Sequence, residues 1–262
     1  MKDRNLPNNQ EMAGRIAFVT GASSGLGAHL AVVLAAHGAR VALGARRKDR
    51  LGEVRAAIER NGGEAFCVEV DVADEASVIA AYDAIGHHWA PVDSVIANAG
   101  VAGEGRALDL TAEAFDEIMA VNVRGVFLTI REAARRMIAA GSAERQHGRI
   151  VIMSSMTAVS VVPGLSAYAA SKAAVLQMGR TLARDWARQG ISVNSICPGY
   201  VATDINADWF ASDAGRRQID KWPRRRLMTP SSLDAIALLL CSDASAQTTG
   251  AHFLIDDGQS TA

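Results

Sequence analysis

Short apolar runs recur along the chain and predict the strands of a central sheet. The runs are continuous rather than alternating between apolar and polar residues. That pattern is typical of strands buried on both faces, as in a parallel sheet between layers of helices. The runs lie at residues 15–20, 40–44, 65–70, 94–97, 149–153, 192–196 and 252–255.

Stretches with apolar residues at helical spacing separate these runs. They lie at residues 26–37, 49–61, 75–87, 112–139, 167–189 and 233–242. Alternation of strand and helix throughout predicts a doubly wound α/β fold of the Rossmann type. We expect one dinucleotide-binding catalytic domain over residues 14–262, preceded by a flexible, polar N-terminal tail over residues 1–13.

One region, residues 203–229, interrupts the alternation. It is weakly periodic and rich in Trp, Asp and Arg. An insertion after a late strand of this fold is placed to cover the crevice at the carboxyl ends of the strands. We therefore expect a substrate lid here. Trp209, Phe210 and Trp222 are apolar enough to cover a hydrophobic substrate, and its arginines either attract an acidic substrate or form a solvated or intersubunit surface.

Composition excludes several classes of partner. Of the 262 residues, 49% are hydrophobic, and the net charge is −1, so neither nucleic acid nor an anionic membrane is an expected partner. The three cysteines are an odd number without a CxxC pair, and the histidines show no metal-ligand spacing. This argues against disulfides and a metal site and favours a reducing compartment. No apolar run is long enough to span a bilayer, so we expect a cytoplasmic protein.

A glycine-rich turn follows the first predicted strand. Gly21, Gly25 and Gly27 have the spacing G-x-x-x-G-x-G and precede a predicted helix; Ser23, Ser24 and Leu26 stand between them. Glycine permits positive φ and close backbone approach, and a helix N-terminus offers free N–H groups to a pyrophosphate. The turn therefore predicts dinucleotide binding, with a purely structural turn as the alternative.

The end of the second strand indicates which dinucleotide is bound. An acidic residue there would hold the ribose 2′-hydroxyl of NAD. This chain instead has Ala45 followed by Arg46, Arg47 and Lys48. Guanidinium groups match phosphate oxygens, so we favour NADP(H) while NAD(H) remains possible. A solvated loop before a charged helix is the alternative.

Tyr168 and Lys172 are four residues apart in a predicted helix, so both side chains lie on one face. A free Tyr has a pKa of about 10, too high for a base at neutral pH. A nearby ammonium group favours the phenolate, so we expect Lys172 to lower the pKa of Tyr168. The pair is thus a candidate for general acid/base catalysis; a packed aromatic beside a solvated lysine is the alternative.

Together the motifs resemble those of the short-chain dehydrogenase/reductases, over about residues 14–260. The likeness is to the branch that includes 3-oxoacyl-carrier-protein reductases and bacterial carbonyl reductases. It implies a seven-stranded parallel sheet with helices on both faces and a Tyr-based hydride-transfer site. The matching motifs occur in order as TGASSGLG at 20–27, Asn98-Ala99-Gly100, Asn122, Ser155, YAASK at 168–172 and Pro198-Gly199.

The resemblance implies a role for each matching residue. Tyr168 is the expected general acid/base, and Lys172 the expected contact of the nicotinamide ribose. Ser155 is expected to hydrogen-bond the substrate oxygen, and Asn122 to hold a water that links Lys172 to solvent. A satisfied buried amide is the alternative for Asn122.

Further residues are implied as cofactor contacts. They are Asp71 and Val72 at the adenine, Asn98, Ala99 and Gly100 at the adenosine side, and Pro198, Gly199, Val201 and Thr203 after the sixth strand. The chain departs from the family pattern at Asp257, where Asp-Gly-Gly is usual; we expect this to affect subunit packing more than chemistry.

The expected function is therefore NADP(H)-dependent transfer of hydride between nicotinamide and a carbonyl or secondary alcohol. A 3-oxoacyl-thioester reductase and an NAD-dependent alcohol, sugar or steroid dehydrogenase remain alternatives. So do a dehydratase or epimerase of related fold, and a nucleotide-binding protein without turnover. The two long predicted helices carry apolar faces suited to isologous contacts, and we expect a homotetramer.

Overall fold

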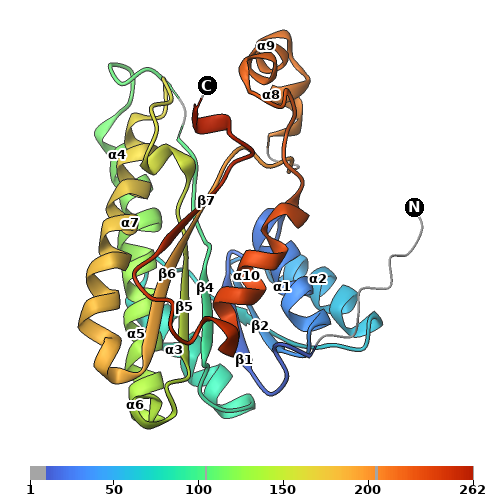
Figure 1. Ribbon diagram of the computed structural model, residues 1–262, viewed down its shortest axis with the longest axis vertical. Coiled ribbons are helices and arrows are strands. Elements are labelled where there is room, and N and C mark those ends of the chain that lie inside the picture. The colour runs from blue at the N-terminus through green and yellow to red at the C-terminus, as the bar shows by residue number, and fades with distance from the viewer. Residues whose placement is uncertain (1–9, 104, 204–205, 262) are drawn as a thin grey trace.

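A computed structural model describes residues 10–103, 105–203 and 206–261 of the chain (Figure 1). Seven strands form one parallel sheet in the order β3-β2-β1-β4-β5-β6-β7. The strands are β1 (Ile16–Thr20), β2 (Arg40–Ala45), β3 (Glu64–Glu69), β4 (Ser94–Ala97), β5 (Gly148–Met153), β6 (Ile191–Pro198) and β7 (His252–Ile255). The predicted fold class is confirmed.

Helices cover both faces of this sheet. The α-helices are α1 (Gly25–Ala36), α2 (Lys48–Arg60), α3 (Glu75–His88), α4 (Ala112–Met119), α5 (Val126–Ala139), α6 (Ser142–Arg145), α7 (Ser166–Trp186), α8 (Ala207–Ala211), α9 (Asp213–Lys221) and α10 (Asp234–Cys241). Short 3₁₀ turns lie at Met156–Ala158, Ala187–Gln189, Pro230–Leu233, Asp243–Ser245 and Gln259–Thr261, and a π-helical segment lies at Ala120–Gly125.

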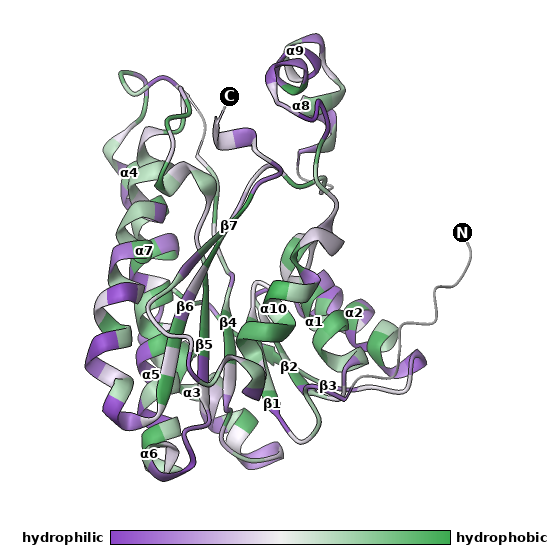
Figure 2. Ribbon diagram, viewed as in Figure 1, coloured by the Kyte–Doolittle hydropathy of each residue, from purple (hydrophilic) through white to green (hydrophobic). Residues whose placement is uncertain are grey.

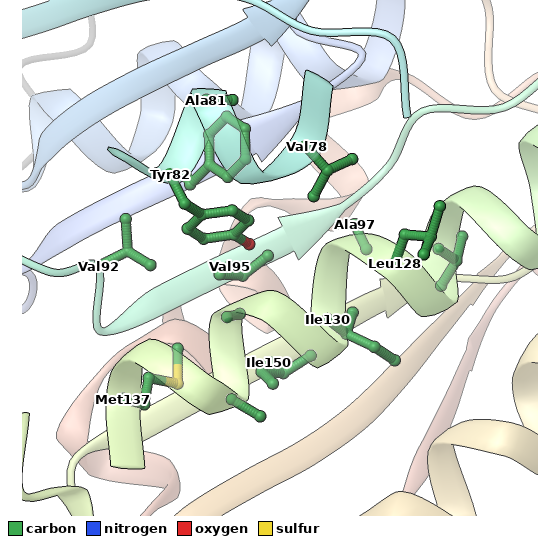
Figure 3. Packing of buried hydrophobic residues seen from close by; sticks show 14 of the residues in the cluster. Val78, Ala81, Tyr82, Val92, Val95, Ala97, Leu128, Ile130, Met137 and Ile150 are labelled. Atoms are coloured by element: carbon green, nitrogen blue, oxygen red, sulfur yellow. The ribbon is translucent and has the colours of Figure 1, made fainter. Parts of the chain in front are cut away.

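Alternating side chains of the strands supply two separate cores. In β1, Ile16 and Phe18 point to the layer of α3, α5 and α7, while Ala17 and Val19 point to the layer of α1, α2 and α10. Figure 3 shows the first core, where Tyr82 of α3 lies among Val95 and Ile130. Figure 2 shows that hydrophobic residues follow the strands and the inward faces of the helices.

The central strands are buried along their whole length, as their continuous apolar runs predict. β1, β4, β5 and β6 consist entirely of buried residues, whereas the edge strands β3 and β7 are partly exposed. All strands are parallel, so their carboxyl ends lie at one edge of the sheet, and the loops that carry the predicted chemistry converge there.

Three expectations from the sequence need correction. The predicted single helix over residues 112–139 contains the π-helical segment at Ala120–Gly125. The weakly periodic region contains α8 and α9, which stand beyond the carboxyl edge in Figure 1; its residues 204–205 lie outside the described residues. Residues 1–9 of the expected tail also lie outside them, but Met12 is fully buried against the α1–α2 core, so the packed chain begins before residue 14.

Candidate active site

A cavity of about 460 Å³ opens at the carboxyl edge of the sheet. Its walls come from residues that follow six of the strands, β1 to β6, so the sheet topology assembles it. The predicted residues that line it are Gly21, Ser23, Ser24, Gly25, Leu26, Arg46, Arg47, Asp71, Val72, Asn98, Ala99, Gly100, Ser155, Tyr168, Lys172, Pro198, Gly199 and Thr203. The sequence-based residues are therefore brought to one place.

Three predicted residues, Gly27, Asn122 and Val201, lie outside the lining. Sequence reasoning missed seven others that line the cavity: Ala45, Val70, Val101, Ala102, Val121, Met153 and Ser154. Each lies beside a residue that was predicted or at a strand end. They are small or apolar residues without chemistry of their own, and only their position next to the motifs could have indicated them.

The glycine turn is shaped for close backbone packing. Gly21 and Gly25 have φ of 69° and 56°, which side chains rarely adopt. A Cβ on Gly27 would lie 2.3 Å from the Gly21 carbonyl oxygen. Gly27 thus packs against the turn on the side away from the cavity, while the N-terminus of α1 faces the cavity.

Asn98 holds this turn to the end of β4. Its side-chain Nδ2 donates to the Thr20 carbonyl at 3.0 Å, and the backbone N–H groups of Asn98 and Ala99 donate to Thr20 Oγ1 at 3.1 and 3.2 Å. The amide that the motif predicts as a cofactor contact therefore also fixes β1 against β4.

Arg47 lies at the adenosine end of the cavity beside both predicted serines. Its Nη2 donates to Ser23 Oγ at 2.9 Å and to Ser24 Oγ at 3.0 Å. The neighbouring Lys48 does not line the cavity and instead pairs with Glu69 at 2.6 Å. Arg46 and Arg47 are thus the cations that the cavity presents where β2 ends.

The two serines after β5 have different partners. Ser154 Oγ donates to the Lys172 carbonyl at 2.9 Å, so it joins the loop to α7. Ser155 Oγ accepts from the Thr157 N–H at 3.1 Å and is hydrogen-bonded to the Tyr168 side chain. Because Ser155 Oγ accepts from the backbone through one lone pair, its hydroxyl proton remains available to donate to Tyr168 or to a substrate oxygen.

Tyr168 and Lys172 lie one turn apart on α7, as predicted. Lys172 Nζ is 5.5 Å from the Tyr168 ring centre and donates to the Met153 carbonyl at 2.9 Å. Burial lowers the pKa of Lys172 to about 8. Burial also raises the pKa of Tyr168, and the Ser155 hydrogen bond only partly opposes this.

In the protein alone burial raises the pKa of Tyr168, and the expectation that Lys172 together with a bound oxidised nicotinamide favours the phenolate stays a prediction. Burial disfavours the charged form of both groups. It therefore lowers the pKa of the Lys172 ammonium and raises the pKa of the Tyr168 phenol. A lysine that is mostly neutral above pH 8 adds little positive charge near the phenol. An additional cation in the cavity would favour the phenolate.

Asn122 is fully buried in the π-helical segment. Its Nδ2 donates to the Val101 carbonyl at 2.9 Å and to Ser171 Oγ at 3.1 Å, and its Oδ1 accepts from the Val101 N–H at 2.8 Å. The amide thus pins the loop after β4 against α7. The side-chain amide therefore has protein partners for its oxygen and its nitrogen, and the expectation that Asn122 holds a water near Lys172 stays a prediction.

The lid aromatics do not line the cavity. Trp222 stacks on Tyr200 with ring centres 5.3 Å apart, and Phe210 meets Tyr200 edge-on at 5.3 Å. Phe210 and Trp222 are buried, whereas Trp209 is 44% exposed. These residues form a small core of their own, so the expectation that they cover an apolar substrate directly is not met.

The cavity fits a dinucleotide on several independent observations. Positive-φ glycines leave no side chain between the backbone and the cavity, a helix N-terminus points into it, and the two arginines flank it. Backbone amides and a helix dipole suit a pyrophosphate, and the arginines suit an additional phosphate. Gly21, Gly25 and Leu26 would hold the pyrophosphate, Asp71 and Val72 the adenine side, and Tyr168 with Lys172 the nicotinamide side.

Comparison with known proteins agrees with this geometry. Residues 15–214 match the short chain dehydrogenase family. D-threitol dehydrogenase of Mycolicibacterium smegmatis is 34% identical over 94% of this chain and 92% of its own. Gluconate 5-dehydrogenase of Gluconobacter oxydans is 32% identical over 96% of this chain and 97% of its own. A crystal structure of a gluconate 5-dehydrogenase from Burkholderia cenocepacia, in complex with NADP and tartrate, superposes with a TM-score of 0.90 at 30% identity, covering 97% of this chain and 98% of that one.

The fold and the cavity define a dinucleotide-binding α/β enzyme. The chain belongs to the short-chain dehydrogenase/reductase family, and it is an oxidoreductase that acts on CH–OH groups. Among the residues that the structure describes, no helix is both long and apolar enough to cross a membrane.

Proposed function

We propose that this enzyme transfers hydride between NADP(H) and a carbonyl or secondary alcohol, with Tyr168 as the general acid/base. The observation that carries the proposal is the cluster of Ser155, Tyr168 and Lys172 inside the dinucleotide cavity. A hydroxyl, a phenol and a lysine beside the nicotinamide end supply the groups that carbonyl reduction requires.

The preference for NADP(H) rests on Arg46 and Arg47. Both line the cavity where β2 ends, and that strand ends on Ala45 rather than on an acid. Ser23 and Ser24 already accept hydrogen bonds from Arg47, so the guanidinium is held at the expected place of a 2′-phosphate. The relative from Burkholderia cenocepacia, crystallised with NADP, supports the same preference.

The chain's own residues divide the remaining work. Bound nicotinamide would supply or accept the hydride at the carbonyl carbon. Tyr168 holds its proton firmly because burial raises its pKa, and it donates that proton to the developing alkoxide. Ser155 donates a second hydrogen bond to the same oxygen. Lys172, held by the Met153 carbonyl, is placed to bind the ribose hydroxyls.

The substrate class follows from the reaction and from the relatives. D-threitol and gluconate 5-dehydrogenases act on polyhydroxylated chains by name, and both cover nearly the whole of this chain. Val101 and Ala102, which line the same cavity as Ser155, carry no charge that would select a charged substrate. We propose a ketone or secondary alcohol of modest size.

The free thiols of Cys67, Cys197 and Cys241 fit the proposed cytoplasmic location.

The test is loss of reduced nicotinamide absorbance over a panel of ketones, diketones, keto sugar acids and 3-oxoacyl thioesters, with NADPH and NADH compared. Tyr168→Phe is expected to lose at least about a hundredfold in turnover while binding NADPH normally. Tyr82→Phe is the matched control, because its hydroxyl donates only to the Thr129 carbonyl, remote from the cavity. Equal activity of Tyr168→Phe and the parent enzyme would contradict the proposal.

A further inference from the structure

The lid is held together by its own aromatic cluster and attached to the sheet through two limbs. The entrance limb is Gly199–Val201, which continues from β6, and the exit limb is Trp222–Met228. A backbone bridge joins Val201 to Met228, where the limbs run side by side. Because α8 and α9 make their core with Tyr200 and Trp222, movement of the limbs moves the lid as a unit.

The turn after β7, residues 256–261, packs against the base of the lid. Asp256 shapes this turn, accepting from the Gly258 N–H at 3.0 Å and the Ser260 N–H at 2.8 Å. Gln259 is buried, and its Oε1 accepts from the Tyr200 N–H at 2.6 Å. A Cβ on Gly199 would lie 2.5 Å from the same Oε1. The turn therefore fixes the entrance limb, which includes cavity residues, through Gln259.

Asp257 contacts the other limb. Its Oδ1 lies 3.1 Å from Arg224 Nε and its Oδ2 lies 2.8 Å from Arg226 Nε, so one carboxylate holds two arginines of the exit limb. The carboxylate is only 16% exposed, whereas both arginine side chains are more than half exposed. Asp257 has φ of 54°, in the left-handed region. Asp tolerates that region better than most residues, although glycine adopts it freely.

We propose that Asp257 is a positioning residue that anchors the exit limb of the lid and thereby sets where α8 and α9 stand relative to the carboxyl edge of the sheet. At a position with positive φ, Asp is no better suited to the backbone than Gly is. Here, however, the Asp257 carboxylate accepts hydrogen bonds from two arginines. Gln259 holds the entrance limb at the Tyr200 N–H, and its Nε2 also donates to the Arg226 carbonyl of the exit limb at 3.5 Å. Loss of the Asp257 carboxylate therefore loosens the exit limb, while the bond from the Tyr200 N–H still holds the entrance limb.

The test compares Asp257→Asn and Asp257→Gly with the parent enzyme. Both replacements suit the left-handed backbone, so folding is preserved. Asp213→Asn is the matched control, because Asp213 pairs with Arg216 within α9 and does not touch the turn after β7. The activity-independent readout is trypsin cleavage, quantified by mass spectrometry, after the basic residues Arg216, Arg217, Lys221, Arg224, Arg225 and Arg226.

We expect both Asp257 variants to be cut in the lid roughly fivefold faster than the parent, because loss of the ion pairs makes local opening of the exit limb more frequent. Added salt should accelerate cleavage of the parent more than cleavage of the variants, because only the parent has the Asp257 pairs with Arg224 and Arg226 to screen. Asp213→Asn should behave as the parent does. Equal cleavage of parent and Asp257 variants, or equal acceleration by Asp213→Asn, would overturn the proposal.

The kinetic readout rests on the proposed function. The Asp257 variants should raise the KM for the carbonyl substrate several-fold, with NADPH affinity and kcat nearly unchanged. A rise in the NADPH dissociation constant of the same size would overturn the separation of the two limbs. If the parent enzyme reduces no carbonyl, the proposed function fails on its own, and the proteolysis comparison still decides the role of Asp257.

Discussion

Lys172 lies with its ammonium nitrogen 5.5 Å from the ring centre of Tyr168, yet its hydrogen bond goes to the Met153 carbonyl. The two side chains share a face of α7 without touching through their polar atoms. Each is buried, and burial works against the charged form of both. Tyr168 is therefore an uncharged acid, and Lys172 beside it loses its proton more readily than a free lysine does. A bound substrate and cofactor would connect the two side chains.

The buried Lys172 gives a pH dependence of stability with a definite sign. Its pKa is about 8 in the folded protein, below the usual 10.5, so between these values the unfolded chain binds a proton that the folded chain has lost. Stability therefore rises with pH across this window, by at most about 1.4 kcal/mol per pH unit. Urea unfolding of the parent and of Lys172→Met between pH 7 and 9.5 measures it, and a pH-independent difference between them would contradict it.

Arg47 should discriminate between the two nicotinamide dinucleotides. Arg47→Ala removes the guanidinium beside Ser23 and Ser24, and hydrogen bonds to a charged phosphate contribute about 1.5–3 kcal/mol. The KM for NADPH should rise about tenfold or more while the KM for NADH stays near its original value. Lys48→Ala is the control, because Lys48 pairs with Glu69 outside the cavity. Equal changes toward both cofactors would argue against 2′-phosphate binding.

Asn122 should matter for stability as well as for activity. Asn122→Ala leaves the Val101 N–H and carbonyl without their side-chain partners, and an unsatisfied buried group costs about 1–3 kcal/mol. Unfolding by urea should show this loss. Ser171→Ala removes the bond from Asn122 and the bond that Ser171 Oγ donates to the Tyr168 carbonyl at 2.7 Å, but it keeps both bonds to Val101, so it should cost less. Similar stability of Asn122→Ala and the parent would show that the loop after β4 is held by other contacts.

A buried ionic cluster lies at the amino ends of the strands. We expect it to contribute to the free energy of unfolding and not to activity. Arg15 is 2% exposed and donates to Asp93 Oδ1 at 3.1 Å, while Asp93 Oδ2 accepts from the Ile16 N–H at 3.0 Å. Asp93→Asn removes one carboxylate partner of Arg15, which keeps its ion pair with Asp243, so it should cost about 1–3 kcal/mol. Glu53→Gln, which breaks an exposed pair with Arg50, should cost less than about 0.5 kcal/mol. Folded Asp93→Asn should keep its KM values, since the cavity lies at the opposite edge.

We also expect a homotetramer. Phe115 of α4 and Ile138 of α5 are 41% and 40% exposed, and exposed apolar side chains on long helices favour contacts between copies. Sedimentation equilibrium at micromolar concentration measures the mass directly. A stable monomer would contradict this prediction.

Much of this architecture was predictable because the signals are local. Continuous apolar runs located each strand to within two or three residues, and glycine spacing placed the turn of Gly21 to Gly27. Ser154 and Ser155 both line the cavity, and the catalytic role of Ser155 stays a prediction. Each of these features depends on neighbours along the chain, which the sequence displays.

Features that depend on distant contacts were not predictable in this way. The π-helical segment around Asn122 is supported by hydrogen bonds to Val101 and Ser171, which lie in other elements. Trp222 was expected to cover a substrate, but it packs on Tyr200 and forms part of a small core. The pKa of Tyr168 depends on how deeply the folded chain buries it, and the burial of Met12 depends on α1.

The turn that holds Gln259 has a consequence for synthesis of the protein. Gly21 emerges from the ribosome early, but the N–H of Tyr200 finds its partner only when residue 259 has been added. Strand β1 likewise waits for β4 before its second edge is paired. A nascent chain therefore has an incomplete nucleotide site until residue 203 has been added, and the base of the lid stays unsupported until the turn at residues 256–261 follows.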